Sequence, residues 1–114
     1  MKPHTNLLNT ILKTAPPNVR LFRNDVGLAE LIDGRRLRYG LLPGSGDLIG
    51  WATIRGVAIF LSIEAKVGRD QVRPKQVTWR ENVIKSGGIA IIAHSSDECW
   101  QSYRDQAVEL PRYW

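Results

Sequence analysis

The stretch from Val57 to Lys66 constrains the fold of this chain more than any other. Its residues are apolar except for three polar side chains near its end. Side chains alternate between the two faces of a strand, so Ser62, Glu64 and Lys66 share one face. Glu64 and Lys66 then lie roughly 7 Å apart along the strand. An acid and a base are costly to bury unless they are paired, liganded or used, so this strand predicts a functional site at its end.

Length and composition bound the remaining possibilities. The chain has 114 residues, and we expect a single domain over residues 1–114. Its 43% hydrophobic and 24% charged residues are ordinary for a globular protein and argue against a disordered one. No segment has the ~18 apolar residues of a membrane span, and the N-terminus does not have the pattern of a signal peptide, so we expect a cytoplasmic protein without membrane contact. The single cysteine, Cys99, has no disulfide partner and is expected to be buried.

Apolar periodicity and turn residues predict the secondary structure. Helices are expected at 7–13, at 74–86 between Pro74 and a glycine pair, and at 96–109 after a capping box of Ser95 and Glu98. The second helix should cover the sheet with a stripe that includes Val77, Val83 and Ile84. Strands are expected at 19–23, 47–51, 57–66 and 89–93, and a strand or loop at 28–32. This order predicts an α/β domain with a central mixed β-sheet of four to five strands, flanked by helices.

The most basic run of the chain contains Arg35, Arg36 and Arg38, followed by Tyr39. One interpretation is a solvated edge strand, because charge prevents exposed sheet edges from pairing with other chains. The alternative is a hairpin that contacts phosphates and offers Tyr39 for base stacking. The net charge of +5 favours a polyanionic partner, and we take the three arginines as candidate nucleic-acid contacts.

Two carboxylates are expected to meet at one end of the sheet. Asp47 opens a strand after a glycine-rich loop, and antiparallel pairing across the turn at 52–56 brings it toward Glu64. Paired carboxylates suit Mg²⁺ or Mn²⁺, and the backbone carbonyl of Ala65 is a candidate third ligand. Lys66 can then orient water or stabilise negative charge on a phosphate. The alternative is a turn aspartate and a same-face ion pair, but the combination favours a phosphodiesterase centre.

The sequence around these residues resembles a known nuclease family. The elements that carry the resemblance are Pro43–Gly50, Ile63–Lys66, Gly68–Arg69, Gln76 and Trp79. They are similar to the VRR-NUC domain (virus-type replication-repair nuclease) of the PD-(D/E)XK nuclease superfamily, over about residues 22–93. The resemblance implies a restriction-endonuclease-like core and a Mg²⁺- or Mn²⁺-dependent endonuclease that hydrolyses phosphodiester bonds in DNA.

The resemblance also implies roles for single residues. Asp47 and Glu64 would be the metal-binding carboxylates, Lys66 the catalytic lysine, and Gln76 a helix residue that faces the site. Further candidate nucleic-acid contacts near the proposed metal ligands are Ser45, Arg69, Arg73 and Lys75. Stand-alone phage and bacterial members act as homodimers, and some resolve four-way DNA junctions, so a homodimer acting on branched or duplex DNA, in repair for example, is the expectation.

The chain departs from this family at its first helix. Family members commonly carry a glutamate there that helps to complete the metal site, whereas this chain has no acidic residue before Asp25. His4, Asn6 and Asn9 remain open as substitutes, and so does the number of metals. The alternative function is a nucleic-acid-binding module of the same fold that has lost turnover.

The aromatic residues and the second histidine have structural interpretations. Trp79 and Trp100 are expected in the core or in an interface rather than on bases. Trp51 and Trp114, as an exposed pair, are candidates for a dimer contact. His94 is expected to be a structural histidine at the end of a buried strand.

Overall fold

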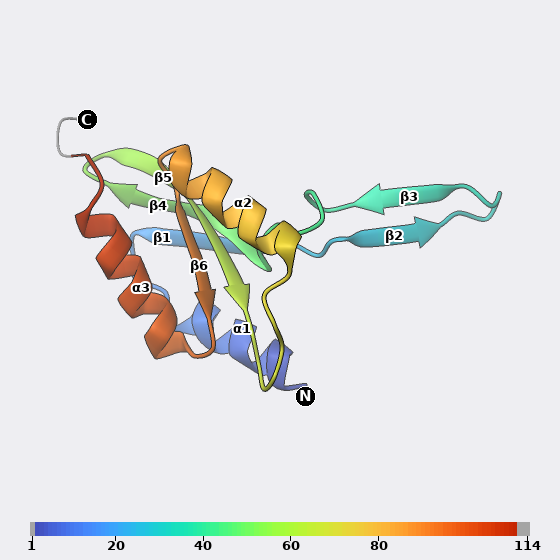
Figure 1. The fold of residues 1–114 in the computed structure, drawn as a ribbon, viewed down its shortest axis with the longest axis horizontal. Helices are drawn as coiled ribbons and strands as arrows, with labels where there is room; N and C mark the ends of the chain where they lie inside the picture. Colours follow the sequence, from blue (N-terminus) through green and yellow to red (C-terminus); the bar gives the residue numbers. More distant parts are fainter. Residues whose placement is uncertain (1, 112–114) are drawn as a thin grey trace.

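The computed structural model describes residues 2–111, which form three helices and six strands (Figure 1). In chain order they are α1 (Pro3–Lys13), β1 (Val19–Arg23), β2 (Gly27–Glu30), β3 (Arg36–Tyr39), β4 (Leu48–Ile54), β5 (Val57–Ala65), α2 (Pro74–Lys85), β6 (Ile89–Ala93) and α3 (Ser96–Val108). The predicted α/β fold with a mixed four-stranded sheet flanked by helices is confirmed. Within residues 2–111, no helix is long and apolar enough to cross a bilayer.

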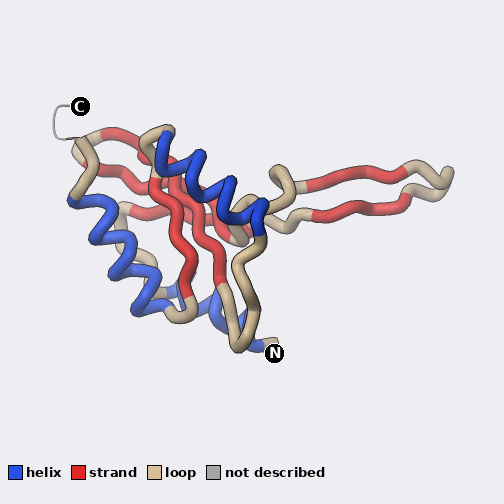
Figure 2. The backbone as a smooth tube through the Cα atoms, viewed as in Figure 1, coloured by secondary structure: helices blue, strands red, loops and turns tan. Residues whose placement is uncertain are grey.

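The main sheet has the order β1-β4-β5-β6 and is flanked by helices (Figure 2). Its strand directions, drawn as arrows in Figure 1, set the position of the site. β4 pairs antiparallel with both β1 and β5, whereas β6 pairs parallel with β5 after the crossover through α2. The β4–β5 turn has positive φ at Arg55 (50°) and Gly56 (78°), as a tight hairpin turn requires. The register Leu48↔Ile63 therefore places Asp47 opposite Glu64, as predicted.

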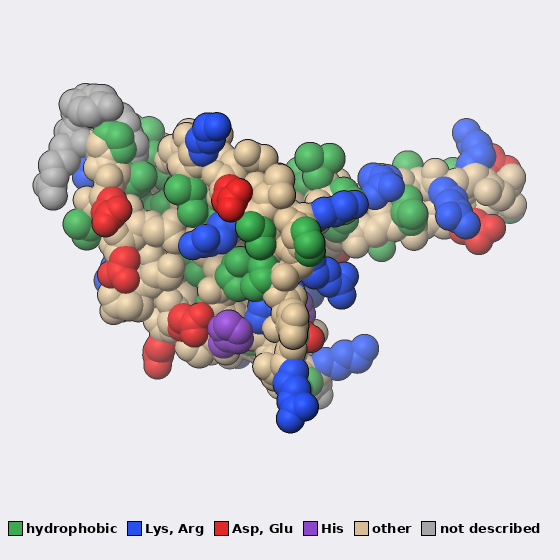
Figure 3. Space-filling view, viewed as in Figure 1, with side chains coloured by type: hydrophobic (Ala, Val, Ile, Leu, Met, Phe, Trp, Pro, Cys, Tyr) green, Lys and Arg blue, Asp and Glu red, His purple; other side chains and the backbone are tan. Residues whose placement is uncertain are grey.

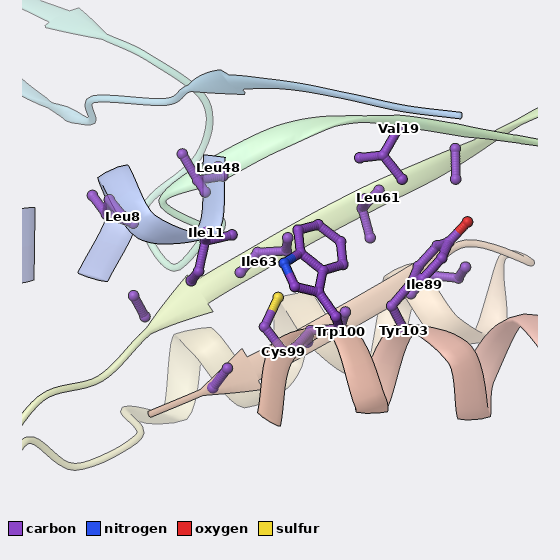
Figure 4. Packing of buried hydrophobic residues seen from close by; sticks show 14 of the residues in the cluster. Leu8, Ile11, Val19, Leu48, Leu61, Ile63, Ile89, Cys99, Trp100 and Tyr103 are labelled. Carbon is purple, nitrogen blue, oxygen red and sulfur yellow. The ribbon is translucent and has the colours of Figure 1, made fainter. Parts of the chain in front are cut away.

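The core lies between one face of the sheet and the two helices α1 and α3 (Figure 4). Strand alternation sends Leu61 and Ile63 of β5 to this face, where both are fully buried. Ile11 of α1 and Trp100 of α3 pack there as well, together with the buried thiol of Cys99. The expected burial of Trp100 and Cys99 is confirmed, and so is that of strand 89–93, whose residues are buried except for partly buried Ile92.

The opposite face of the sheet is covered by α2 only beside β5 and β6. The predicted apolar stripe of α2 is wrong in part, because Val83 is buried while Val77 and Ile84 are exposed. The helix is mostly polar and contacts the sheet through Val83 and through Trp79, whose indole Nε1 donates to Ser62 Oγ at 2.8 Å. The rest of this face, over β1, β4 and the first half of β5, is called the open sheet face below.

Strands β2 and β3 form a separate two-stranded hairpin that projects from the domain (Figure 1). The basic run forms β3, a solvated strand whose one partner among residues 2–111 is β2, so it belongs to a hairpin and not to the edge of the main sheet. The register Ala29↔Leu37 and Glu30↔Arg36 gives the hairpin one largely apolar face and one charged face. Lys and Arg side chains are visible along its length in Figure 3. This hairpin is called the β2–β3 arm.

Two helix starts matter for function. α1 begins at Pro3 with Lys2 as its N-cap, four residues earlier than predicted, because a proline at the first helical position is already preset for the helix. His4 therefore belongs to the first turn of α1. α3 begins after Ser95, whose Oγ accepts from Glu98 N at 3.1 Å as predicted, while His94 is exposed and lies 3.2 Å from Glu98. Trp114 lies outside the described residues.

Candidate metal centre

Three side chains from distant parts of the chain meet at the end of β5. They are His4 from the first turn of α1, Asp47 from the residue before β4, and Glu64 from β5. Each offers one ligand atom, and these atoms all lie within 4.8 Å of one another. Asp47 and Glu64 were predicted to meet here, and the structure brings His4 to the same point.

Asp47 is held in place by a network that starts at Asn24. The Asn24 Nδ2 group donates to Ser45 Oγ and to the Gly46 carbonyl, both at 2.8 Å. Its Oδ1 accepts from Leu41 N at 3.1 Å, and its own backbone N–H donates to the Asp47 carbonyl at 2.8 Å. One amide side chain thus fixes both ends of the loop that leads to Asp47. The buried hydroxyl of Ser45 is part of this network, and a contact between Ser45 and nucleic acid stays a prediction.

The glycines of this loop are required by its close approach to β5 and α2. A Cβ atom at Gly46 would collide with Ser62 Oγ and lie 2.9 Å from the carbonyl oxygen of Ile63. Gly44 has φ of +94°, a conformation that other residues rarely adopt. The glycine spacing therefore lets the loop lie against β5, so that Asp47 reaches Glu64.

His4 reaches the site because it shares the buried face of α1. Leu8 and Ile11 follow it at helical spacings of four and seven, and both are buried in the core. The His4 Nε2 atom lies 3.2 Å from Asp47 Oδ2 and 3.2 Å from the carbonyl oxygen of Ala65. Sequence reasoning left His4 as one of three candidates, although Pro3 followed by this apolar spacing was the signal that selects it.

The Glu64 carboxyl group is buried and strongly perturbed. Glu64 is only 8% exposed. Burial is the largest cause that raises its pKa from 4.5 to about 8, with a hydrogen bond to Asp47 and the negative charge of Asp47 acting in the same direction and the charges of Lys66 and Arg73 opposing them. Asp47 Oδ2 also accepts from Ala65 N at 2.8 Å. The Glu64 carboxyl group therefore keeps its proton at neutral pH unless a cation replaces it.

Lys66 is the third predicted catalytic residue, and it is buried beside this pair. It is 6% exposed, and its charge acts on Glu64. Its backbone N–H donates to the Ala93 carbonyl at 2.9 Å, which extends the pairing of β5 with β6 past the end of both strands. The backbone that carries the Lys66 side chain is thus held by hydrogen bonding to β6.

The carboxyl groups open into a polar cavity of about 750 Å³. Its lining also contains Gln76 and Arg73, which α2 presents at its start. Gln76 Oε1 accepts from Arg73 N at 2.9 Å, so this amide caps the helix and faces the cavity as predicted. Arg73 and Lys75 line a second hollow of about 500 Å³ next to it.

The other predicted basic contacts lie farther away. Arg69 is exposed in the turn after β5. Arg36 and Arg38 share the charged face of the β2–β3 arm, and Arg35 precedes this strand and is paired with Asp33 at 2.7 Å. None of these four arginines lines the polar cavity.

The donor set defines the class of site: two carboxylates, an imidazole and a backbone carbonyl at the end of an α/β sheet, with a buried lysine beside them. No protein-family model, no curated protein and no solved structure matches this chain. The resemblance to the VRR-NUC domain therefore rests on the sequence elements given above.

Proposed function

We propose that this protein is a metal-dependent DNA endonuclease. One observation carries the proposal: the carboxyl groups of Asp47 and Glu64 converge with the Ala65 carbonyl on one point, and Lys66 is buried beside them. A buried acid and a buried base, Glu64 and Lys66, are expensive for a purely structural role, because hydrophobic residues would fill the same volume at lower cost. The arrangement is the one that phosphodiester hydrolysis assisted by a metal requires.

The residues present fit a divalent cation. Asp47 Oδ2 and the Ala65 carbonyl oxygen both lie 3.2 Å from His4 Nε2, so two oxygen atoms and one nitrogen atom gather at one place. Asp47, Glu64 and the Ala65 carbonyl would hold Mg²⁺ or Mn²⁺, and His4 adds a nitrogen donor that suits Mn²⁺ better than Mg²⁺. A cation held there supplies activation of water and neutralisation of phosphate charge.

The protein's own side chains would stabilise charge and position the phosphate during hydrolysis. A water oxygen forms a bond to phosphorus, the phosphorus–oxygen bond to the leaving strand breaks, and the leaving oxygen takes a proton from solvent. Lys66 stabilises the negative charge that develops on the phosphoryl oxygens. Glu64 would be ionised when it holds the cation, and the proton that the attacking water gives up passes to solvent. Gln76 and Arg73 border the cavity in which the phosphate would lie.

The charge distribution supports DNA as the substrate. Arg73 and Lys75 continue from the cavity into the neighbouring hollow, and Arg36 and Arg38 extend the basic surface along the arm. Contacts of this kind bind the phosphate backbone without reading sequence. A homodimer with two such centres would cut both strands of a branched or duplex DNA symmetrically.

Cleavage assays test the proposal. The purified protein is incubated with linear duplex, flap and four-way junction DNA in Mn²⁺, in Mg²⁺ and in EDTA. We expect cleavage only with the cation, and a rate at least about 100-fold lower for Asp47→Asn, Glu64→Gln or Lys66→Met.

Two matched controls remove the same charges from exposed positions of α2. Glu81→Gln and Lys85→Met should cleave at the wild-type rate, because both residues are exposed and lie outside the cavity lining. DNA affinity should stay within about threefold for the site variants. Cleavage at the wild-type rate by all three site variants would overturn the proposal. DNA binding without cleavage and without a Mn²⁺ response would show a binding module instead.

A further inference from the structure

A row of aromatic side chains crosses the open sheet face next to the proposed metal centre. It runs from β1 through β4 and β5 to α2, and it consists of Phe22, Trp51, Phe60 and Trp79. The first pair has ring centroids 5.8 Å apart, and the last pair 6.1 Å apart. Trp51 and Phe60 are register partners on neighbouring strands, which makes the row continuous. These four residues are called the aromatic row.

The rings of the aromatic row are accessible. Phe22 is 57% exposed, Trp51 41% and Phe60 39%. Rings this large are normally buried, and α2 covers the sheet only beside β5 and β6. Trp79 is fixed by its hydrogen bond to Ser62 Oγ, so the α2 end of the row is already oriented. The row thus presents several flat faces at little cost in side-chain entropy.

The aromatic row and the metal centre share one face of the sheet. Phe60 and Glu64 lie four residues apart on β5 and point to the same side, roughly 13 Å along the strand. Phe22 belongs to the register row between them, opposite Ile49 of β4. A nucleic-acid strand whose phosphate lies at Glu64 would therefore pass over the aromatic row with its neighbouring nucleotides.

The chemistry around the row fits bases better than another protein surface. Arg20 is the register partner of Trp51 on the same face, which places a cation beside the rings for a phosphate. Phe60 and Trp79 border a groove of about 730 Å³ whose lining holds Asn82 and Ser86 and, among residues 2–111, no charged side chain. Such a groove offers apolar walls for a base with amide and hydroxyl groups for its polar edge.

We propose that the aromatic row binds unpaired bases of the substrate strand, so that the enzyme acts on DNA with single-stranded or branched segments. Bases in an intact duplex are already stacked and cannot reach the rings, whereas bases at a branch or in a single strand can. The inference rests on the proposed function for the identity of the strand. The aromatic row itself is independent of cleavage.

Binding without metal tests the inference separately from catalysis. Fluorescein-labelled oligothymidylate, a four-way junction and a blunt duplex are titrated in EDTA, with tryptophan fluorescence as a second readout. We expect the oligothymidylate to quench tryptophan emission. Trp51→Leu should weaken oligothymidylate binding about tenfold, and the double variant Phe22→Leu/Trp51→Leu more, while duplex affinity changes less than about twofold. Leucine keeps an apolar side chain but removes the stacking face.

Controls separate this result from folding and from the proposed function. Val108→Ala changes an exposed apolar residue of α3, which packs on the other face of the sheet, and should bind like the wild type. Glu64→Gln should lose cleavage and keep oligothymidylate affinity. The cleavage assay therefore tests the proposed nuclease function, and the binding assay tests the aromatic row independently of it. Unchanged oligothymidylate affinity in the Phe22→Leu/Trp51→Leu variant overturns the inference. So does a sedimentation result in which that variant turns a dimer into monomers without changing affinity per chain, which would make the row an interface between copies.

Discussion

Replacing Glu64 by glutamine should stabilise the metal-free protein while it abolishes metal binding. The pKa of Glu64 is raised to about 8 in the folded protein, against 4.5 in the unfolded chain, so folding takes up a proton. The corresponding stability is fully present below pH 4.5 and is lost as the pH rises through 8. Glutamine is neutral at every pH, has nearly the same shape, and can donate a hydrogen bond to Asp47.

The size of the effect follows from the pKa shift. Each pKa unit corresponds to about 1.4 kcal/mol, and the full shift would give about 5 kcal/mol. The carboxyl group borders a polar cavity open to water, so screening reduces the expected value to about 2 kcal/mol. In EDTA, the free energy of unfolding of the wild type should therefore fall by about 2 kcal/mol more between pH 5 and pH 9 than that of Glu64→Gln.

Urea unfolding at pH 5, 7 and 9, followed by circular dichroism, measures this difference. Glu81→Gln serves as the control, since this exposed residue should leave the pH dependence of the wild type unchanged. Added Mn²⁺ should raise the melting temperature of the wild type at pH 8 and have no such effect on Glu64→Gln. A variant that shows the same pH dependence as the wild type, or is less stable at pH 9, would refute the reasoning.

Three further predictions concern other parts of the molecule. His4→Glu supplies an all-oxygen donor set, so the ratio of cleavage rates in Mg²⁺ and Mn²⁺ should rise severalfold, and an unchanged ratio would exclude His4 as a ligand. Gly50→Ala should lower the free energy of unfolding by about 3 kcal/mol in urea, because its Cβ collides with the backbone carbonyl of Arg20. Burial raises the pKa of Cys99 to about 12, so a thiol reagent at pH 8 should react with the native protein only at the rate of unfolding.

The sheet could be predicted from the sequence because its strands carry strong local signals. The alternating side chains near the end of β5 predict one face in the core, and the continuous apolar run of β6 predicts burial on both faces. The meeting of Asp47 with Glu64 followed from antiparallel pairing across a short turn. The separation of the basic run at residues 35–38 from the main sheet did not follow, because a strand at the edge of that sheet and a strand of a projecting hairpin have the same local pattern.

The cover of the second sheet face was mispredicted for a related reason. Val77 and Ile84 are seven residues apart and share one side of α2, whereas Val83 lies on another side, and it is this other side that packs on the sheet together with Trp79. One large ring anchored by a hydrogen bond decided how α2 lies on the sheet. Periodicity alone weighs all apolar residues alike and cannot anticipate this choice.

Only part of the metal centre could be predicted from local sequence patterns. Glu64 and Lys66 could be singled out by their position on an apolar strand, but His4 is joined to them only through the packing of α1 on the core. If Leu8 and Ile11 fix the rotation of α1, a helix that carries a metal ligand is coupled to the stability of the core. Leu8→Ala, which leaves a cavity under α1, should then weaken Mn²⁺ binding as well as stability. Loss of stability without loss of Mn²⁺ affinity would show that His4 is not a ligand.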